Sequence, residues 1–451
     1  MPKKIKIKHG FTLLESLVGI FLLAVLSLGI YTAYAFGMKT SVHNRLRAAA
    51  ATIAEKRIET IRAMRYAEVG TEGGIPPGNL APLITEENNG TDFSIQTSVR
   101  YLDDAYDGKA PEDTAAADYK QVEVKVNWPT NLEEKSVVLN TLITPPRIET
   151  NLGMGVLIIN TVNGEGTPIP ESKIQIFNNS VSPYVSLTEE TDENGSLTLP
   201  GVPKSDQKYE VNISKNGYMP ANTYPPYPKT SFMPIDTHLA ISEGGVTSKV
   251  FIIDKIGHLK LRFLDTLGNV LPNLNFSLYG GKVIGTTVEP APQSVYFYNE
   301  TSLVSDAEGI WNSPDFHKGP YNFSISNNEY ELIALSNSLP WIVSPDATTE
   351  ETITMGKKTE NILVVRIKEQ GGEVPVADAV VKLTDSTGAF FQETKTNSDG
   401  IAYLPQIEDP AKTLNPAETY TLDITKDAYD PYQTTLTVSG LTRKDITLNP
   451  Q

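Results

Sequence analysis

The stretch Gly10-Phe11-Thr12-Leu13-Leu14-Glu15-Ser16 opens an apolar segment that carries no further charge as far as Met38. Four lysines precede the stretch, at positions 3, 4, 6 and 8. An ordinary secretory signal has its cleavage site after the apolar core. Here the glycine comes before that core, so cleavage after Gly10 would keep the apolar segment in the mature chain. This order of residues predicts a basic leader peptide over residues 1–10 and a transmembrane segment over residues 11–38.

Glu15 is the only charged residue in the predicted transmembrane segment. An ionised side chain inside a membrane helix costs about 2.5 to 3.5 kcal/mol on insertion scales, and such groups pair with a partner. The alternative is a plain signal anchor, in which the glutamate reaches the membrane surface. Glu15 therefore needs either a counter-charge or access to water.

This order of residues resembles the N-terminus of type IV prepilins and pseudopilins. In that family a prepilin peptidase cuts after the glycine and methylates the new N-terminal phenylalanine, which are Gly10 and Phe11 in this sequence. The resemblance implies that the α-amine of Phe11 pairs with Glu15 of a neighbouring subunit. Pairing would neutralise both charges in hydrocarbon and set the axial register between subunits. Because Gly10, Phe11 and Glu15 are all in place, we favour this interpretation over the signal anchor.

The resemblance also implies partners and a location for the chain. The partners are the prepilin peptidase, membrane lipid before assembly, and other pilin subunits bound through the N-terminal helix. The chain would cross the cytoplasmic (inner) membrane once, with its short leader in the cytoplasm. After processing it would join an extracellular filament at the cell surface.

A single long helix is expected over residues 11–66, because this range contains no proline and Thr12 can cap the first turn. Such a helix is roughly 84 Å long at ~1.5 Å per residue, far more than the ~30 Å of membrane hydrocarbon. Its second half is amphipathic and should pack on a sheet of the same subunit. The apolar stripe consists of Val42, Leu46, Ala50, Ile53, Ile58, Ile61 and Met64.

Length, net charge and composition indicate what kind of protein follows this helix. A length of 451 residues predicts several domains, about three to five. The formal net charge of −16 becomes −20 once the four leader lysines are removed, so the acidic body would repel nucleic acid. The absence of cysteine excludes disulfides and thiolate metal sites. The 31 prolines and 32 glycines indicate a β-rich body with frequent turns.

Nothing in the sequence points to catalysis. The chain has five histidines, at positions 9, 43, 238, 258 and 317, and they lie far apart in sequence. There is no G-x-S-x-G motif, no H-E-x-x-H motif and no phosphate-binding loop. We therefore predict that the protein is not an enzyme and has no organic cofactor.

Residues 67–147 are predicted to form a small β domain. After a Gly/Pro-rich loop, Thr91 to Leu102, Tyr119 to Trp128 and Lys135 to Ile143 read as strands. The block resembles the small sheet that packs on a pilin helix. Trp128 is interpreted as a core residue at a strand end rather than as a binding residue.

A cluster of acids lies between the first two of these strands. Asp103, Asp104 and Asp107 precede Gly108, and Glu112, Asp113 and Asp118 follow. Carboxylates at this spacing could wrap a structural Ca²⁺, which takes six to eight oxygen ligands. The alternative is a solvated hairpin loop with Asp-Gly turn chemistry, which we favour because the spacing is not that of an EF-hand.

The remainder of the chain contains a degenerate internal repeat. Its units open at Gly155, His258 and Ile362, at intervals of 103 and 104 residues. Each unit has a proline-marked turn, a second strand, an acidic glycine turn and a strand that opens with tyrosine. This pattern is similar to the carboxypeptidase regulatory-like or transthyretin-like β-sandwich. We place β-sandwiches at 153–252, 253–356 and 357–451, with an insertion at Gly281 to Thr301 in the second.

The stretch from Tyr218 to Pro234 is a candidate contact loop, because it combines three tyrosines with five prolines. The tyrosines are Tyr218, Tyr224 and Tyr227. Exposed tyrosines on a stiff loop suit contact with surface carbohydrate or protein. The alternative, which we favour, is a loop packed back on its own sandwich.

The sequence thus predicts an α+β protein: a long N-terminal membrane and assembly helix on a small antiparallel sheet, followed by three tandem Ig-like or transthyretin-like sandwiches. We expect a structural subunit of a type IV pilus-like filament. The bulk of three outer domains favours a minor or tip subunit over a close-packed major one. The alternatives are a pseudopilin of a type II-like secretion system and a membrane-anchored surface adhesin.

Overall fold

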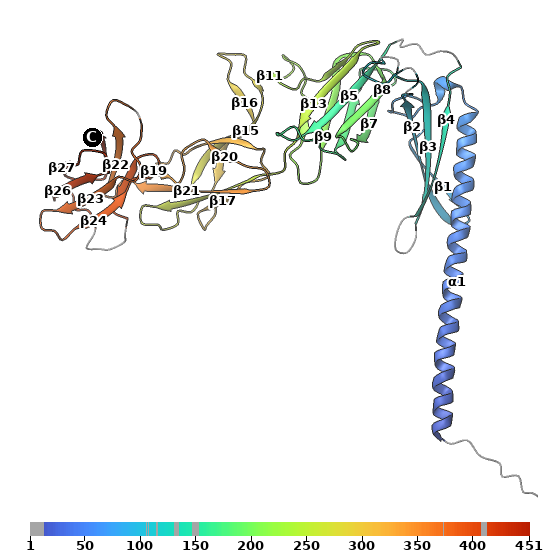
Figure 1. The fold of residues 1–451 in the computed structure, drawn as a ribbon, viewed down its shortest axis with the longest axis horizontal. Coiled ribbons are helices and arrows are strands. Elements are labelled where there is room, and N and C mark those ends of the chain that lie inside the picture. The colour runs from blue at the N-terminus through green and yellow to red at the C-terminus, as the bar shows by residue number, and fades with distance from the viewer. Residues whose placement is uncertain are drawn as a thin grey trace, which may run out of the picture.

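The computed structural model describes residues 13–104, 106, 108–113, 116–129, 135–146, 153–372, 374–406 and 413–451. One helix, α1 (Leu13–Arg62), runs unbroken for 50 residues. The β domains follow one another in a row that leads away from the C-terminal end of this helix (Figure 1). The predicted fold class is confirmed: one long apolar helix precedes many strands in several sheets.

The second half of α1 packs on a four-stranded antiparallel sheet in the order β1-β2-β3-β4. Three strands lie where the sequence predicts them: β2 (Thr91–Leu102), β3 (Tyr119–Trp128) and β4 (Lys135–Ile143). The prediction missed β1 (Leu83–Asn88), whose run of polar residues gives little strand signal. It also extended the helix too far, because α1 ends at Arg62 and a short 3-10 turn, η1 (Tyr66–Glu68), follows.

The core between α1 and this sheet contains most of the predicted helix stripe. Five α1 side chains are buried: Ala50, Ile53, Ala54, Ile58 and Ile61. Val42 is 45% exposed, so the stripe begins closer to the C-terminus than predicted. Trp128 is buried at the end of β3 and its ring packs near His43 and Phe93, as expected for a core residue.

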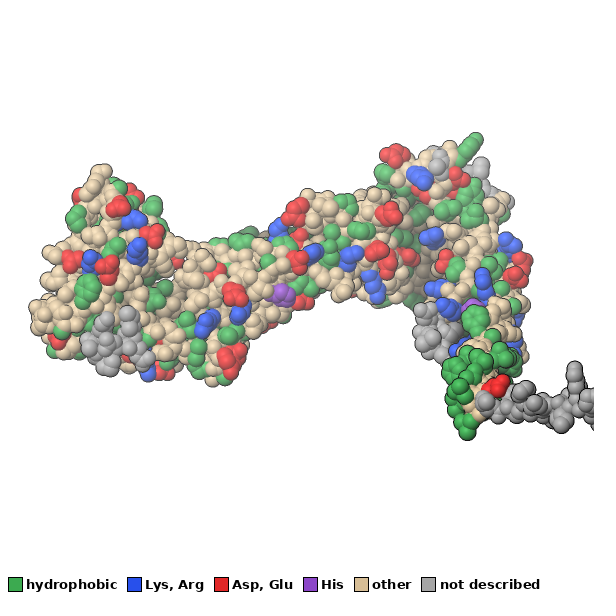
Figure 2. All heavy atoms as spheres, turned by 60° about the horizontal axis from the view of Figure 1, so that its bottom comes forward, with side chains coloured by type: hydrophobic (Ala, Val, Ile, Leu, Met, Phe, Trp, Pro, Cys, Tyr) green, Lys and Arg blue, Asp and Glu red, His purple; other side chains and the backbone are tan. Residues whose placement is uncertain are grey.

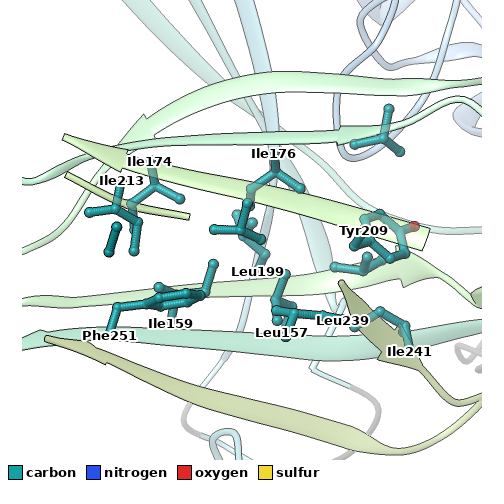
Figure 3. Close-up of a cluster of buried hydrophobic side chains, with 14 of the residues drawn as sticks. Leu157, Ile159, Ile174, Ile176, Leu199, Tyr209, Ile213, Leu239, Ile241 and Phe251 are labelled. Carbon is teal, nitrogen blue, oxygen red and sulfur yellow. The ribbon is translucent and has the colours of Figure 1, made fainter. Parts of the chain in front are cut away.

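The first sandwich has two sheets, in the orders β10-β9-β6-β7, with β12 on β9, and β13-β5-β8. Ile174, Ile176 and Ile213 point from the first sheet toward Leu157, Ile159 and Phe251 of the second (Figure 3). The strands are β5 (Met154–Val162), β6 (Lys173–Asn178), β7 (Val185–Glu190), β8 (Ser196–Pro203), β9 (Ser205–Ser214), β10 (Ala221–Asn222), β12 (Leu239–Ile241) and β13 (Val246–Ile252).

The second sandwich has sheets in the orders β11-β15-β18-β20, with β16 on β15, and β17-β14-β21-β19. The predicted insertion forms the outer part of a long β15–β16 arm (Figure 1). The strands are β11 (Met233–Pro234), β14 (His258–Asp265), β15 (Asn275–Thr286), β16 (Ser294–Val304), β17 (Ile310–Asn312), β18 (Gly319–Ser324), β19 (Tyr330–Leu335), β20 (Trp341–Val343) and β21 (Thr348–Lys357).

The third sandwich has sheets in the orders β25-β22-β28 and β24-β23-β26-β27. In all three sandwiches the first strand pairs in parallel with the last, namely β5 with β13, β14 with β21, and β22 with β28. The strands are β22 (Ile362–Glu369), β23 (Val380–Asp385), β24 (Phe391–Lys395), β25 (Ile401–Leu404), β26 (Tyr420–Thr425), β27 (Tyr432–Leu436) and β28 (Leu441–Leu448).

The repeated acidic glycine turns are held by one side chain at the start of each. Asp192 Oδ1 accepts hydrogen bonds from the backbone nitrogens of Asn194 and Ser196, at 2.9 and 2.8 Å. Asp306 and Asn397 bond the same relative positions in the other two sandwiches. These residues therefore fix turns, as the sequence predicts, and are typical of local side-chain capping.

A repeated tyrosine completes each sandwich core. Tyr209, Tyr321 and Tyr420 are fully buried, and each hydroxyl bonds a backbone group four to six residues upstream. The hydroxyl of Tyr209 donates to Pro203 O at 2.6 Å, and that of Tyr321 donates to His317 O at 3.0 Å. Burial raises the pKa of all three tyrosines, so their hydroxyls stay protonated.

The domains contact one another at each junction. Ile75, from the Gly/Pro-rich loop after α1, joins the core of the first sandwich, and the ring of Tyr101 packs against Gly201. A segment of the first sandwich adds β11 to the edge of β15 in the second. Ile333 of β19 packs with Val364 of the third sandwich. The three sandwiches, which together form a stalk, are thus joined to one another and to the helix-bearing domain by packing as well as by the covalent chain.

Candidate functional site

The N-terminal half of α1 is the main candidate functional element. Within the described residues, α1 is the one helix long and apolar enough to cross a membrane, with a mean hydropathy of 2.4 in its best 18-residue window and none of that window buried. A signal sequence near an N-terminus meets the same criteria. Apolar side chains gather on the free part of the helix, whereas charges of both signs are scattered over the stalk (Figure 2). Lipid or other helices must cover this apolar surface.

Glu15 lies in the first turn of α1. The nearby side chains of Leu14 and Leu17 are 71% and 61% exposed. The positive end of the helix dipole favours a carboxylate at this position. Gly10 and Phe11, the predicted cleavage and methylation residues, lie outside the described residues. The predicted pairing of Glu15 with the Phe11 amine of another subunit therefore stays a prediction.

Small residues interrupt the apolar surface at intervals along the free half of α1. A Cβ added at Gly19, Gly29 or Gly37 would meet no atom within 4 Å, so each glycine faces open space. Small surfaces of this kind let a second helix approach closely in a membrane. The helix continues through all three positions, and the hydroxyl of Thr32 donates to Gly29 O at 2.9 Å.

Polar contacts fix the other half of α1 to its sheet. The guanidinium of Arg62 donates to the hydroxyl of Thr141 on β4, from Nη2 at 2.8 Å. Arg57 Nε donates to Thr97 on β2, at 3.4 Å. Lys120 Nζ on β3 donates to Tyr66 O and Val69 O, just beyond the helix, at 2.8 and 2.7 Å. The exposed N-terminal half of α1 therefore extends from a C-terminal half that is fixed to the sheet.

Three members of the acidic cluster come together within the described residues. Carboxylate oxygens of Asp103, Asp113 and Asp118 all lie within 4.8 Å of one another. Asp104 instead accepts a hydrogen bond from the backbone nitrogen of Tyr106, and its own nitrogen donates to Asp118 Oδ2. Asp107 lies outside the described residues. The strands bring Asp118 back beside Asp103, which sequence spacing alone could not show.

The chemistry of the cluster suits a hard cation but does not require one. Asp103 Oδ1 is buried and has no hydrogen-bond partner among the described residues, whereas Asp103 Oδ2 accepts from Ala110 N at 2.9 Å. Three carboxylates supply fewer oxygens than the six to eight that Ca²⁺ takes. The calcium site thus stays a prediction, and a calorimetric titration tests it: Asp103→Asn should abolish any saturable Ca²⁺ binding, whereas Asp192→Asn should not.

The candidate contact loop packs largely on its own sandwich. Tyr218 and Tyr224 are half-buried, the first against the core and the second against Phe232, with ring centroids 5.6 Å apart. Tyr227 is 47% exposed and is the tyrosine of the three best placed for an outside contact. The C-terminal part of the loop serves the junction with the second sandwich through β11.

One cleft lies where sequence reasoning could not find it, at the junction of the second and third sandwiches. It has a volume of about 420 Å³. Apolar side chains of β19 form one wall, and the third sandwich lines the rest with Val364, Arg366, Asp399, Ile401, Arg443 and Asp445. Arg443 is engaged across the junction with Glu331 at 2.7 Å, so part of this lining holds the two domains together.

An exposed apolar helix of membrane length, fixed to a small sheet and followed by three sandwiches, is typical of a membrane-anchored stalk protein. Residues 5–31 match the family model of the prokaryotic N-terminal methylation motif. The match covers Gly10, Phe11, Glu15 and the first part of α1. The motif indicates a pilus-type subunit that a peptidase processes and that assembles with other pilin subunits.

Several solved structures match the chain at low sequence identity and low TM-score. The chain is similar to the Bacillus anthracis TIE protein, with 12% identity over 82% of this chain and 76% of that chain, and a TM-score of 0.20. It is also similar to a streptococcal ancillary pilin (13% identity, 66% and 98% covered, TM-score 0.18) and to the minor pilin of Streptococcus agalactiae (15% identity, 45% and 95% covered, TM-score 0.21). TM-scores this low do not bear on what the chain does. A search of curated proteins returns no match.

Proposed function

We propose that this chain is a structural subunit of a type IV pilus-like filament, cleaved after Gly10 and N-methylated at Phe11. The observation that carries the proposal is the methylation motif at residues 5–31, which continues directly into a helix that is exposed and apolar in its first half. A plain signal anchor would be enough to hold a stalk in the membrane, so the methylation motif indicates more than anchoring. Assembly through α1 would transfer its apolar surface from lipid to neighbouring helices.

Glu15 gives this assembly its register. A carboxylate within hydrocarbon is costly, and an amine at the same depth on a neighbouring subunit lowers that cost. The amine created by cleavage at Phe11 is close in sequence to Glu15, so two subunits offset by a short axial step can bring the groups together. Other offsets would leave both charges in an apolar environment.

The stalk favours a minor or tip position in the filament. The three sandwiches lead sideways from the head of α1, and packing joins them at each junction (Figure 1). A shaft made only of this chain would have to place such a stalk on every subunit. We propose that the outer domains act as a stalk or adhesive module, with surface carbohydrate or protein as ligand, and that the chain performs no catalysis.

Isolation of the filament tests this function. Sheared surface filaments should contain the chain together with other subunits that carry the same N-terminal motif. The second candidate, a pseudopilin, is favoured if no surface filament contains the chain and its deletion stops secretion of another protein. A surface adhesin anchored alone would remain in the membrane fraction without helical partners, and this result would contradict the proposal.

A further inference from the structure

Within the part of the chain that the structure describes, the outer edge of strand β16 has no strand partner. β16 is the outer strand of the arm that stands out from the second sandwich (Figure 1). Among the described strands, only β15 pairs with β16. With 11 residues, β16 is also the longest outer strand in the described parts of the three sandwiches. A row of main-chain donors and acceptors is therefore available along its free edge.

This edge lacks the short length, the proline and the clustered charges that keep other sheet edges from pairing. Proteins protect outer strands with short length, charge or proline. Here β8 contains Pro200 and Pro203, and β13 contains Lys249. The last strand, β28, carries three adjacent charges, Arg443, Lys444 and Asp445. β16 contains no lysine, arginine or proline, and its single charge is Glu300.

A β-bulge limits the part of β16 that can pair regularly. The register with β15 shifts between Phe276 and Leu278, which leaves one extra residue on β16 near Thr301. Along the preceding segment, Ser294–Glu300, the register shifts twice more, between Gly280 and Val283 and between Val283 and Gly285, but there the extra residues lie on β15 and β16 itself carries no bulge. It contains three consecutive aromatic residues, of which Phe297 is 40% exposed.

We propose that a second copy of this chain pairs with the free edge of β16, antiparallel and centred on Phe297. The two copies would be related by a two-fold axis, so each contact occurs twice. In this register Tyr296 faces Tyr298, and Ser294 faces Glu300 of the other copy. Aromatic cross-strand pairs stabilise a sheet, and no like charges lie opposite each other.

The distribution of charge favours this register over one centred on Glu300. A pair centred on Glu300 would place two carboxylates directly opposite each other, which is unfavourable. It would also draw the bulge near Thr301 into the ladder. Pairing through β16 joins stalks rather than helices, so it goes beyond the proposed assembly through α1 and requires no cleavage at Gly10.

The absence of natural cysteine makes disulfide trapping a direct test. In the proposed register Val295 of one copy faces Asn299 of the other. The full chain is prepared in detergent as Val295→Cys and as Asn299→Cys, each with its own tag, and the two are mixed under mild oxidation. A mixed disulfide dimer is expected, because opposed Cβ atoms lie about 4.5–5.5 Å apart.

Each single variant is the matched control. Equivalent cysteines in a dimer centred on Phe297 are separated by four residues, or about 13 Å, so neither variant should cross-link with itself. Val250→Cys, an exposed position on β13, gives the background of random collision. A mixed yield no higher than this background, or strong self-cross-linking of Asn299→Cys, would overturn the proposed pairing.

Charge at position 294 provides a second test that does not depend on a disulfide. Ser294 is exposed, so its substitution leaves the fold intact. Ser294→Lys places an ammonium opposite Glu300, and Ser294→Glu places a carboxylate there. The dimer Kd, measured by sedimentation, should fall about two- to thirtyfold for the first variant and rise by a similar factor for the second. Equal values for both variants would contradict the register.

Discussion

The packing of α1 on its sheet predicts a large local effect for Ile61→Ala. Ile61 is fully buried in the core that contains Val122, Val124 and Trp128. Truncation of a fully buried isoleucine to alanine costs about 2 to 5 kcal/mol, because the transfer free energy is lost and a cavity remains. Since about 1.4 kcal/mol corresponds to a factor of ten, amide exchange in β3 should accelerate about 30-fold or more.

The assay is hydrogen exchange of the full chain in detergent, followed by mass spectrometry of peptides from β3. Ile30→Ala is the matched control, because Ile30 lies on the same helix and is 62% exposed. The control should leave exchange in β3 unchanged. If Ile61→Ala changed this exchange less than threefold, or if Ile30→Ala changed it equally, the assignment of the two halves of α1 to different surroundings would be wrong.

Three further predictions concern the helix, a domain junction and a buried histidine. Glu15→Gln should leave membrane insertion and cleavage intact but reduce the amount of chain recovered in sheared filaments by tenfold or more, because the Phe11 amine would lose its counter-charge and an uncompensated charge in a membrane helix costs about 2.5 to 3.5 kcal/mol. Normal recovery would refute the pairing. Gly285→Val should detach β11 from β15, because a Cβ at this position would lie 2.3 Å from Met233 O and 2.4 Å from the Phe232 ring. Small-angle scattering should then show a more flexible stalk, and an unchanged profile would contradict a role of β11 in holding the first two sandwiches together. Burial lowers the pKa of His317 to about 4, below its ordinary value of 6.5, so the unfolded chain binds the proton first and stability is lost as the pH falls from about 6.5 to 4. His317→Leu should remove that part of the pH dependence in denaturant melts, and an identical slope in both proteins would refute it.

The sequence predicted the elements whose signals are local. Strands β2, β3 and β4 begin and end at the predicted residues, because their alternating patterns are bounded by polar or proline-containing segments. The acidic glycine turn of each repeat unit was also predicted, and Asp192, Asp306 and Asn397 hold these turns, since a side chain that caps its own turn needs no distant partner. The helix was predicted from an absence of proline and a long apolar run.

What the sequence did not predict depends on contacts between distant segments. Asp118 lies beside Asp103 because β2 and β3 pair, and spacing along the chain does not reveal this contact. The segment from Tyr218 to Pro234 was expected to pack back on its own sandwich, but its tyrosines and prolines do not reveal that its last two residues, β11, pair with β15. The free edge of β16 becomes visible only when the order of strands is known.

The central claim is that this chain is a processed, assembled pilus-type subunit, and the mature N-terminus tests it most directly. Mass spectrometry of the chain recovered from its native membrane or filament should find an N-terminal peptide that begins at Phe11 and carries one methyl group on its α-amine. A chain that still begins at Met1 in the assembled material would contradict the account.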